Sequence, residues 1–150
     1  MNLILWRHAE AEDGSNDMER KLTSRGHKQA EMSAKWLRKH APGDLCILVS
    51  PAKRTRQTAD ALDMKYDIVP EIAPGATPEI LLQAAKWPEG EKNVLVVGHQ
   101  PTLGAAIRLM LTGTSGPWTV RKSGVWWLAR RERGDDSQVV VRAVIDTDHL

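Results

Sequence analysis

Cysteine, strong net charge and long apolar runs are what this 150-residue sequence has least of. Cys46 is the only cysteine, which excludes an intrachain disulfide and a thiolate metal cluster. The 21 basic and 19 acidic side chains leave a net charge of +2, too small to predict binding to nucleic acid or to a membrane. No segment approaches the roughly 20 apolar residues that span a bilayer. An ordinary globular protein is the expectation that remains.

A leader peptide and phenylalanine are also missing. Residues 1–6 carry no basic leader, and their apolar run is too short for a signal peptide, so we expect a cytoplasmic location. Phe is absent, whereas Trp occurs six times, and we expect Trp to replace Phe in the core. The length and the lack of a linker or an internal repeat predict a single domain over residues 1–150.

Strand-like segments recur along the chain. The buried-strand candidates are residues 3–6, 45–49 and 93–97, and residues 67–76 predict a short edge strand followed by a loop. Two further segments, 125–130 and 138–145, flank the turn-rich Gly134-Asp135-Asp136 and predict a hairpin.

Helix signals lie between the strand candidates. Thr23 is typical of an N-cap, Ser50-Pro51 of an N-cap followed by a proline at N1, and Thr77-Pro78 repeats that signature. The second helix is predicted to extend through Leu62 and the third to about Trp87, and a fourth follows Gln100-Pro101. The alternation predicts an α/β fold, a three-layer α/β/α sandwich with a mostly parallel central sheet and an antiparallel C-terminal hairpin.

Cationic and histidine side chains follow three of the predicted strands. Arg7-His8 follows the first, Ser50-Pro51 and the basic group around Arg54 follow the second, and Gly98-His99 follows the third. Singly, each has an ordinary structural explanation, such as a pair of Arg7 with Glu10. In a parallel sheet, however, ligands bind beyond the carboxyl ends of the strands. Two arginines and two histidines at one such edge predict an anion site, and phosphate is the commonest dianion.

Several phosphate chemistries are not supported by the sequence. It has no GxxxxGK[ST] loop, which excludes a P-loop nucleotide enzyme. It shows no carboxylate cluster with metal-ligand spacing, so we expect neither a metal nor another cofactor. Cys46 lies within a predicted strand, a poor place for a catalytic thiolate. An imidazole is the nucleophile that remains.

Three motifs in register resemble those of the histidine phosphatase superfamily. "LWRHAEAE" is similar to its Arg-His-Gly signature, with Ala9 where many members have Gly. "LVSPAKRTRQTA" is similar to its Ser-Pro-x-x-Arg-x-x-Gln-Thr motif, and "VVGHQP" to its second-histidine motif. The short chain and "ERKLTSRGHKQA" most resemble the small bacterial branch of phosphohistidine phosphatases. The resemblance implies a phosphoglycerate mutase-like fold.

The resemblance also implies roles for individual residues. His8 matches the nucleophile, which takes the phosphoryl group and then yields it to water. Arg7 and Arg54 match the phosphate-clamping arginines, and His99 matches the second histidine that holds the phosphoryl oxygens. Arg20 falls in a loop that in this branch precedes the first helix, where contact with phosphate or substrate competes with simple solvation.

The proton donor and the substrate are left open by the sequence. The resemblance gives Glu71 a position similar to that of the family's acid, and a surface or loop-bracing glutamate is the slightly favoured alternative. The first hypothesis is a phosphatase acting on phosphohistidine in a protein. The second is a small-molecule phosphomonoesterase or mutase-like enzyme that uses Glu71 as its acid. The third is a non-catalytic, phosphate-dependent binding module.

Adjacent Trp126 and Trp127 are expected on opposite sheet faces, so at most one is clearly core.

Overall fold

The computed structural model describes residues 1–134 and 136–150. Within them, one sheet has the strand order β3-β2-β4-β1-β5-β6. Its strands are β1 (Asn2–Arg7), β2 (Leu45–Val49), β3 (Asp67–Ile68), β4 (Asn93–Gly98), β5 (Val125–Arg133) and β6 (Asp136–Ile145). The pairs among β1 to β4 are parallel, whereas β5 and β6 form an antiparallel hairpin. The predicted hairpin is confirmed, but Asp135 of its predicted turn lies outside the described residues.

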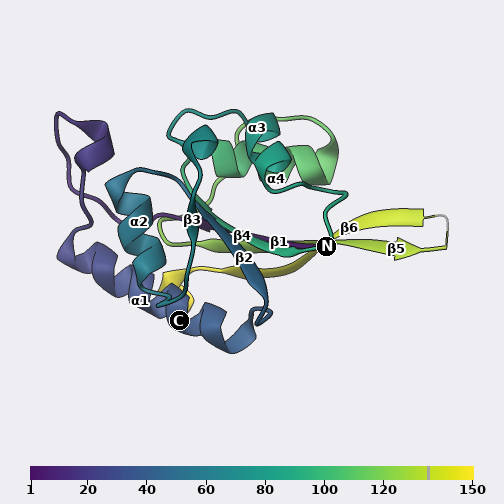
Figure 1. Ribbon diagram of the computed structural model, residues 1–150, viewed down its shortest axis with the longest axis horizontal. Helices are drawn as coiled ribbons and strands as arrows, with labels where there is room; N and C mark the ends of the chain where they lie inside the picture. The colour runs from purple at the N-terminus through teal and green to yellow at the C-terminus, as the bar shows by residue number, and fades with distance from the viewer. Residues whose placement is uncertain (135) are drawn as a thin grey trace.

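Helices cover both faces of this sheet (Figure 1). They are α1 (Ser24–His40), α2 (Lys53–Asp60), α3 (Pro78–Ala84) and α4 (Thr102–Thr112), with 3-10 turns η1 (Asp17–Glu19), η2 (Pro70–Ile72) and η3 (Thr147–His149). Helices α1 and α2 pack on one face, and α3 and α4 pack on the other. The predicted α/β/α sandwich is confirmed. Among the described residues, no helix is both long and apolar enough to cross a bilayer.

The two cores follow from the side-chain alternation of the central strands. In β1, Leu3 and Leu5 pack with α3 and α4, whereas Ile4 and Trp6 pack with α1 and α2. All four are fully buried, which explains why the strand reads as a continuous apolar run.

Two tryptophans, Trp6 and Trp127, are part of the buried core. Trp6 is fully buried, and Trp127 packs edge-on against Trp36 with ring centroids 6.4 Å apart. Trp126 points to the other face, is half-buried, and packs edge-on against Trp118 at 5.9 Å. The prediction that the adjacent pair divides between the two faces is therefore confirmed.

The predicted N-cap is correct for α1 and wrong for α2. Thr23 caps α1 as predicted, since its hydroxyl accepts a hydrogen bond from Gly26 N at 2.9 Å. Gly26 also lets α1 approach the chain after β1, because a Cβ there would collide with the Glu10 carbonyl. Ser50, by contrast, is not the N-cap of α2, which begins at Lys53 with Ala52 preceding it.

Two helices were predicted to extend further along the chain than they do. Helix α2 ends at Asp60 rather than at Leu62, and α3 ends at Ala84 rather than near Trp87. In both cases the chain leaves the helix before an apolar residue that packs against the core. The apolar pattern therefore extends past the end of each helix because these residues are buried, although they are no longer helical.

Candidate active site

The parallel register aligns three strand ends at one edge of the sheet. Arg7 pairs with Gly98, and Val49 pairs with Val97, so the residues that follow meet beyond the strands. Two more ladder-like bonds extend the alignment, from His8 N to Gly98 O and from Ser50 N to Val97 O, both 3.1 Å.

The predicted residues His8, His99, Arg7 and Arg54 come together at this edge. The rings of His8 and His99 have centroids 5.3 Å apart, and both histidines are buried. Arg54 reaches in from the first turn of α2 and is only 4% exposed. The positive charges of Arg54 and Arg7 both lower the pKa of His8, which is consistent with their proximity.

His8 is held in one tautomer by its own chain. Its Nδ1 lies 2.7 Å from Ala9 O, and a carbonyl only accepts, so Nδ1 carries the proton and Nε2 keeps a lone pair. Burial lowers the pKa of His8 to about 4; the hydrogen bond to Ala9 opposes this shift, and the nearby arginines reinforce it. At neutral pH the ring is therefore uncharged and able to act as a nucleophile at Nε2.

His99 is oriented by Ser50. The Ser50 hydroxyl lies 2.7 Å from His99 Nε2 and also accepts a longer bond from Ala52 N at 3.4 Å. Among the described residues, His99 Nε2 is the one acceptor within reach of the buried Ser50 hydroxyl proton. We therefore assign that proton to the bond with Nε2, which leaves the ring proton on Nδ1. Burial, followed by the repulsion that His8 exerts when it is protonated, lowers the pKa of His99 to about 3. This contact of Ser50 could not be predicted from the sequence, because Ser-Pro before a helix is also an ordinary cap pattern.

The two arginines are each held by a carbonyl. Arg7 Nη1 donates to Val120 O at 2.9 Å, and Arg54 Nη1 donates to Asp17 O at 2.7 Å. Arg54 Nη2 also lies 3.2 Å from Asp17 Oδ2. The alternative pair of Arg7 with Glu10 is not formed, since Glu10 instead contacts Thr23 and Lys122.

Three buried nitrogens of this cluster have no hydrogen-bond partner among the described residues. They are Arg7 Nε, Arg54 Nε and His99 Nδ1. An unsatisfied buried donor costs roughly 1–3 kcal/mol, so such groups are rare outside functional sites. All three are donors in the tautomers assigned above, which is the set of groups that a tetrahedral oxyanion requires.

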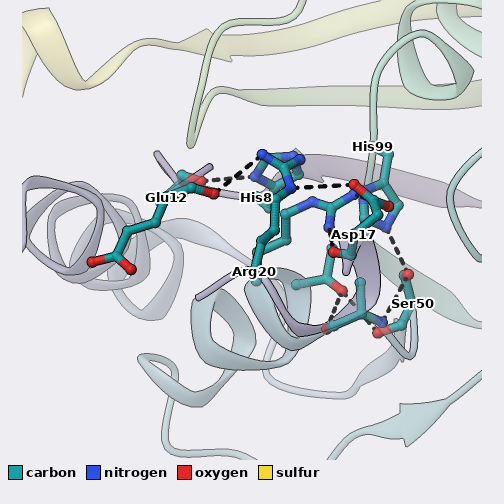
Figure 2. Close-up of polar contacts among 10 residues, drawn as sticks. His8, Glu12, Asp17, Arg20, Ser50 and His99 are labelled. Carbon is teal, nitrogen blue, oxygen red and sulfur yellow. Dashed lines mark hydrogen bonds and ion pairs between the residues drawn. The ribbon is translucent and has the colours of Figure 1, made fainter. Parts of the chain in front are cut away.

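A loop closed at its base covers one side of the cluster. Ala11 and Leu22 form an isolated antiparallel bridge, and η1 lies between them. Within the loop, Arg20 Nε pairs with Asp17 Oδ1 at 3.2 Å, and Arg20 Nη1 donates to Glu12 O at 3.3 Å (Figure 2). The charge of Arg20 lowers the pKa of both His8 and His99, so Arg20 lies within electrostatic reach of them.

Asp17 is a site residue that the sequence analysis missed. It lies in a polar segment with several other acids, and no periodicity separates it from them. Desolvation is the largest single influence on the pKa of Asp17 and raises it, but the hydrogen bonds and charges of Arg54 and Arg20 together outweigh it. The pKa is therefore lowered, and Asp17 is ionised at neutral pH. Asp17 is therefore suited to hold Arg54 and unsuited to donate a proton.

Glu71 lies in η2, beyond the edge strand β3, and is exposed. It has no ion pair or side-chain hydrogen bond with the other described residues. Its assignment as a proton donor stays a prediction.

Comparisons with known proteins identify relatives of this chain. The model of the histidine phosphatase superfamily (branch 1) matches residues 3–76. The chain is 35% identical over 128 residues to a phosphohistidine phosphatase SixA homolog of Haemophilus influenzae, covering 71% of this chain and 75% of the relative. It is 30% identical to phosphohistidine phosphatase SixA of Escherichia coli, covering 78% of each chain.

The fold agrees as well. A solved structure of the protein histidine phosphatase SixA complexed with tungstate superposes with a TM-score of 0.83 at 23% identity, covering 99% of each chain. This chain therefore belongs to the histidine phosphatase superfamily and is a hydrolase of the phosphatase class.

Proposed function

We propose that this enzyme removes the phosphoryl group from phosphohistidine in a protein, through a phosphorylated His8. The observation that carries the proposal is the uncharged, buried His8, with Nε2 free, beside three donors without protein partners. Relatives named as phosphohistidine phosphatases support the substrate class. The complex of one such protein with tungstate, a tetrahedral oxyanion, supports the predicted mode of binding.

In the first step, His8 Nε2 attacks phosphorus in line with the bond to the substrate imidazole. The P–N bond of the substrate breaks as the P–N bond to His8 forms. Arg7 Nε, Arg54 Nε and His99 Nδ1 donate to the equatorial oxygens, where charge is stabilised in the transition state. The substrate imidazole, protonated on its distal nitrogen, leaves as a neutral ring, and His8 becomes a phosphorylated imidazolium.

In the second step, water replaces His8 at phosphorus. The P–N bond to His8 breaks, orthophosphate forms, and the neutral His8 ring is restored with its Nδ1–H still donating to Ala9 O. Because imidazole both enters and leaves, neither P–N bond requires a strong acid. This symmetry fits a site in which the ionised Asp17 is bound to Arg54.

The test follows phosphate from a labelled protein phosphohistidine through the enzyme. Rapid quenching should show transient label on wild type and none on His8→Ala, which should also fail to dephosphorylate the substrate. His27→Ala is the matched control, because His27 is an exposed histidine of α1 and should keep full activity. A substrate that keeps its label in the presence of wild type would overturn the proposal.

A panel of aryl phosphates separates the competing hypotheses. If esters with poor leaving groups react nearly as fast as those with good ones, and Glu71→Gln removes that ability, the enzyme is a phosphomonoesterase with Glu71 as its acid. If phosphopeptides bind but His8 is never labelled, the protein is a binding module.

A further inference from the structure

A second, charged groove adjoins the phosphate site. It has a volume of about 260 Å³ and opens between the start of α1, the segment before β5 and the C-terminal turn η3. Its charged lining residues are Arg7, Arg25, Arg121, Lys122, Asp146 and Asp148. Cations therefore outnumber acids in its walls.

Arg7 forms the wall that the groove shares with the phosphate site. Its Nη1 is bonded to Val120 O, and its Nε is one of the three buried nitrogens without a partner. The segment before β5, which lines the groove, is also hydrogen-bonded to the backbone of His8, since Ser123 N donates to His8 O at 3.1 Å. A group bound in the groove would thus lie next to a phosphoryl group held at His8.

The cations of the groove differ in how well they are neutralised. Arg121 is paired with Asp146 at 2.8 Å and with Asp148 at 3.1 Å. Lys122 has one long contact, 3.7 Å to Glu10. Arg25 takes part in no ion pair or side-chain hydrogen bond within residues 1–134 and 136–150. Arg25 and Lys122 therefore supply the positive charge that is left uncompensated.

The position of Arg25 strengthens this asymmetry. It lies in the first turn of α1, which contains no acidic residue. A cation is unfavourable at the positive end of a helix dipole, whereas an anion there is stabilised by both the dipole and the guanidinium. An anion bound between Arg25 and Lys122 would relieve this local repulsion.

We propose that this groove is a specificity subsite for an acidic side chain of the protein substrate, adjacent to its phosphohistidine, with Arg25 and Lys122 as the recognising residues. The inference rests on the proposed function, since it requires a polypeptide on both sides of the phosphorylated residue. Both residues line this one groove, and a carboxylate is the side-chain group that pairs with a forked guanidinium and with a lysine charge.

The experiment compares two phosphohistidine peptides that differ only in flanking Glu or Gln residues. Wild type should prefer the acidic peptide by roughly fivefold in kcat/KM, a modest factor because exposed ion pairs are weak. The preference should shrink to about twofold in Arg25→Ala and in Lys122→Ala, and it should diminish with added salt. Arg25→Glu should favour the neutral peptide. Lys28→Ala is the matched control, an exposed cation of the same helix that does not line the groove and should keep the wild-type preference.

The outcomes separate the two claims. Equal turnover of both peptides by wild type overturns the subsite and leaves the proposed function standing. A preference that persists in the Arg25→Ala, Lys122→Ala double variant also overturns the subsite. Turnover of neither peptide, with a small aryl phosphate still hydrolysed, overturns the proposed function and the subsite with it.

Discussion

The arginines at the two ends of the sheet differ in how completely their nitrogens are hydrogen-bonded. At the carboxyl ends of the parallel strands, Arg7 and Arg54 are held by carbonyls and each keeps a buried Nε without a protein partner. At the other end, the β5–β6 hairpin extends past the start of β1 (Figure 1). There Arg130 Nε donates to Ser137, and its Nη groups pair with Glu89 and Glu132.

The difference shows which arginines the protein satisfies by itself. Arg130 has partners on all three nitrogens and lies near solvent, so its contacts stabilise the hairpin weakly and require no ligand. Arg7 and Arg54 carry an unmet donor into a buried site, which has a cost in the free protein and a benefit once an oxyanion binds. Incomplete hydrogen bonding, rather than the residue type, marks the functional end.

Substitution of the arginines gives the largest expected contrast between the two ends. Arg54→Ala should lower kcat/KM by about 10²- to 10³-fold, because it removes one preorganised donor from the transition state. Arg130→Ala should leave kcat/KM within about twofold of wild type and change the free energy of unfolding by no more than about 1 kcal/mol. Steady-state kinetics and urea unfolding measure both. Equal losses of activity at the two ends would refute the comparison.

Removing the support of His99 should have the next largest effect. Ser50→Ala should lower kcat by roughly tenfold, because His99 then loses the hydrogen bond that fixes its tautomer and orientation. Ser50→Thr keeps the hydroxyl and should restore most of the rate. The two variants are compared by kcat at saturating substrate, with unfolding curves as the check on the fold. A fully active Ser50→Ala would contradict the assignment of His99 Nδ1 as a donor.

The loop contact to Arg54 should matter less. Asp17→Asn keeps the backbone bond to Arg54 Nη1 but removes the carboxylate charge, so we expect KM to rise roughly threefold with little change in kcat. Asp13→Asn is the control, an exposed acid of the same loop with no ion pair to the described residues. A fall in kcat without a rise in KM would show that Asp17 acts on more than the position of Arg54.

Acidification from pH 7 to pH 5 should have the smallest effect on the site itself, because the protonation states of His8 and His99 should hardly change. With the pKa of His8 near 4, its ring stays mostly neutral over this range, and an ordinary histidine, with a pKa near 6.5, would not. Histidine ring NMR should therefore show the His8 and His99 signals, assigned with His8→Asn and His99→Asn, unchanged down to about pH 5. A midpoint near 6.5 for either ring would falsify the buried, uncharged pair.

The lowered pKa values of His8 and His99 also make the free energy of unfolding depend on pH, because unfolded histidines have an ordinary pKa. Unfolded histidine takes up a proton near pH 6.5, whereas folded His8 and His99 do so only near pH 4 and 3. Their contribution is therefore complete above pH 6.5 and is lost as the pH falls below it. Each ring should lower the free energy of unfolding by roughly 1.4 kcal/mol per pH unit in that window.

Much of the fold could be predicted from local pattern. The strand at residues 45–49 was predicted with the bounds of β2, because a run buried on both faces has no polar alternation. Thr23 was identified as a cap because its side chain bonds only two to three residues ahead. The single domain, the cytoplasmic location and the role of Glu71 stay predictions.

The partners of Ser50 and Asp17 could not be predicted from local sequence patterns. Ser50 has the sequence context of a helix cap, yet its partner, His99, is 49 residues away and meets it only through the pairing of β2 with β4. Asp17 becomes a partner of Arg54 only because the loop between Ala11 and Leu22 folds back over α2.

The sequence by itself determined the order of the elements and predicted, through its resemblance to a family, the groups that bind phosphate, because periodicity, caps and motif spacing are local properties of the chain. Only the tertiary structure decided which nitrogens are left without partners, which tautomers the two rings adopt, and that Arg25 and Lys122 share a groove with Arg7. Those properties depend on burial and on contacts between segments far apart in sequence, and no local pattern encodes them.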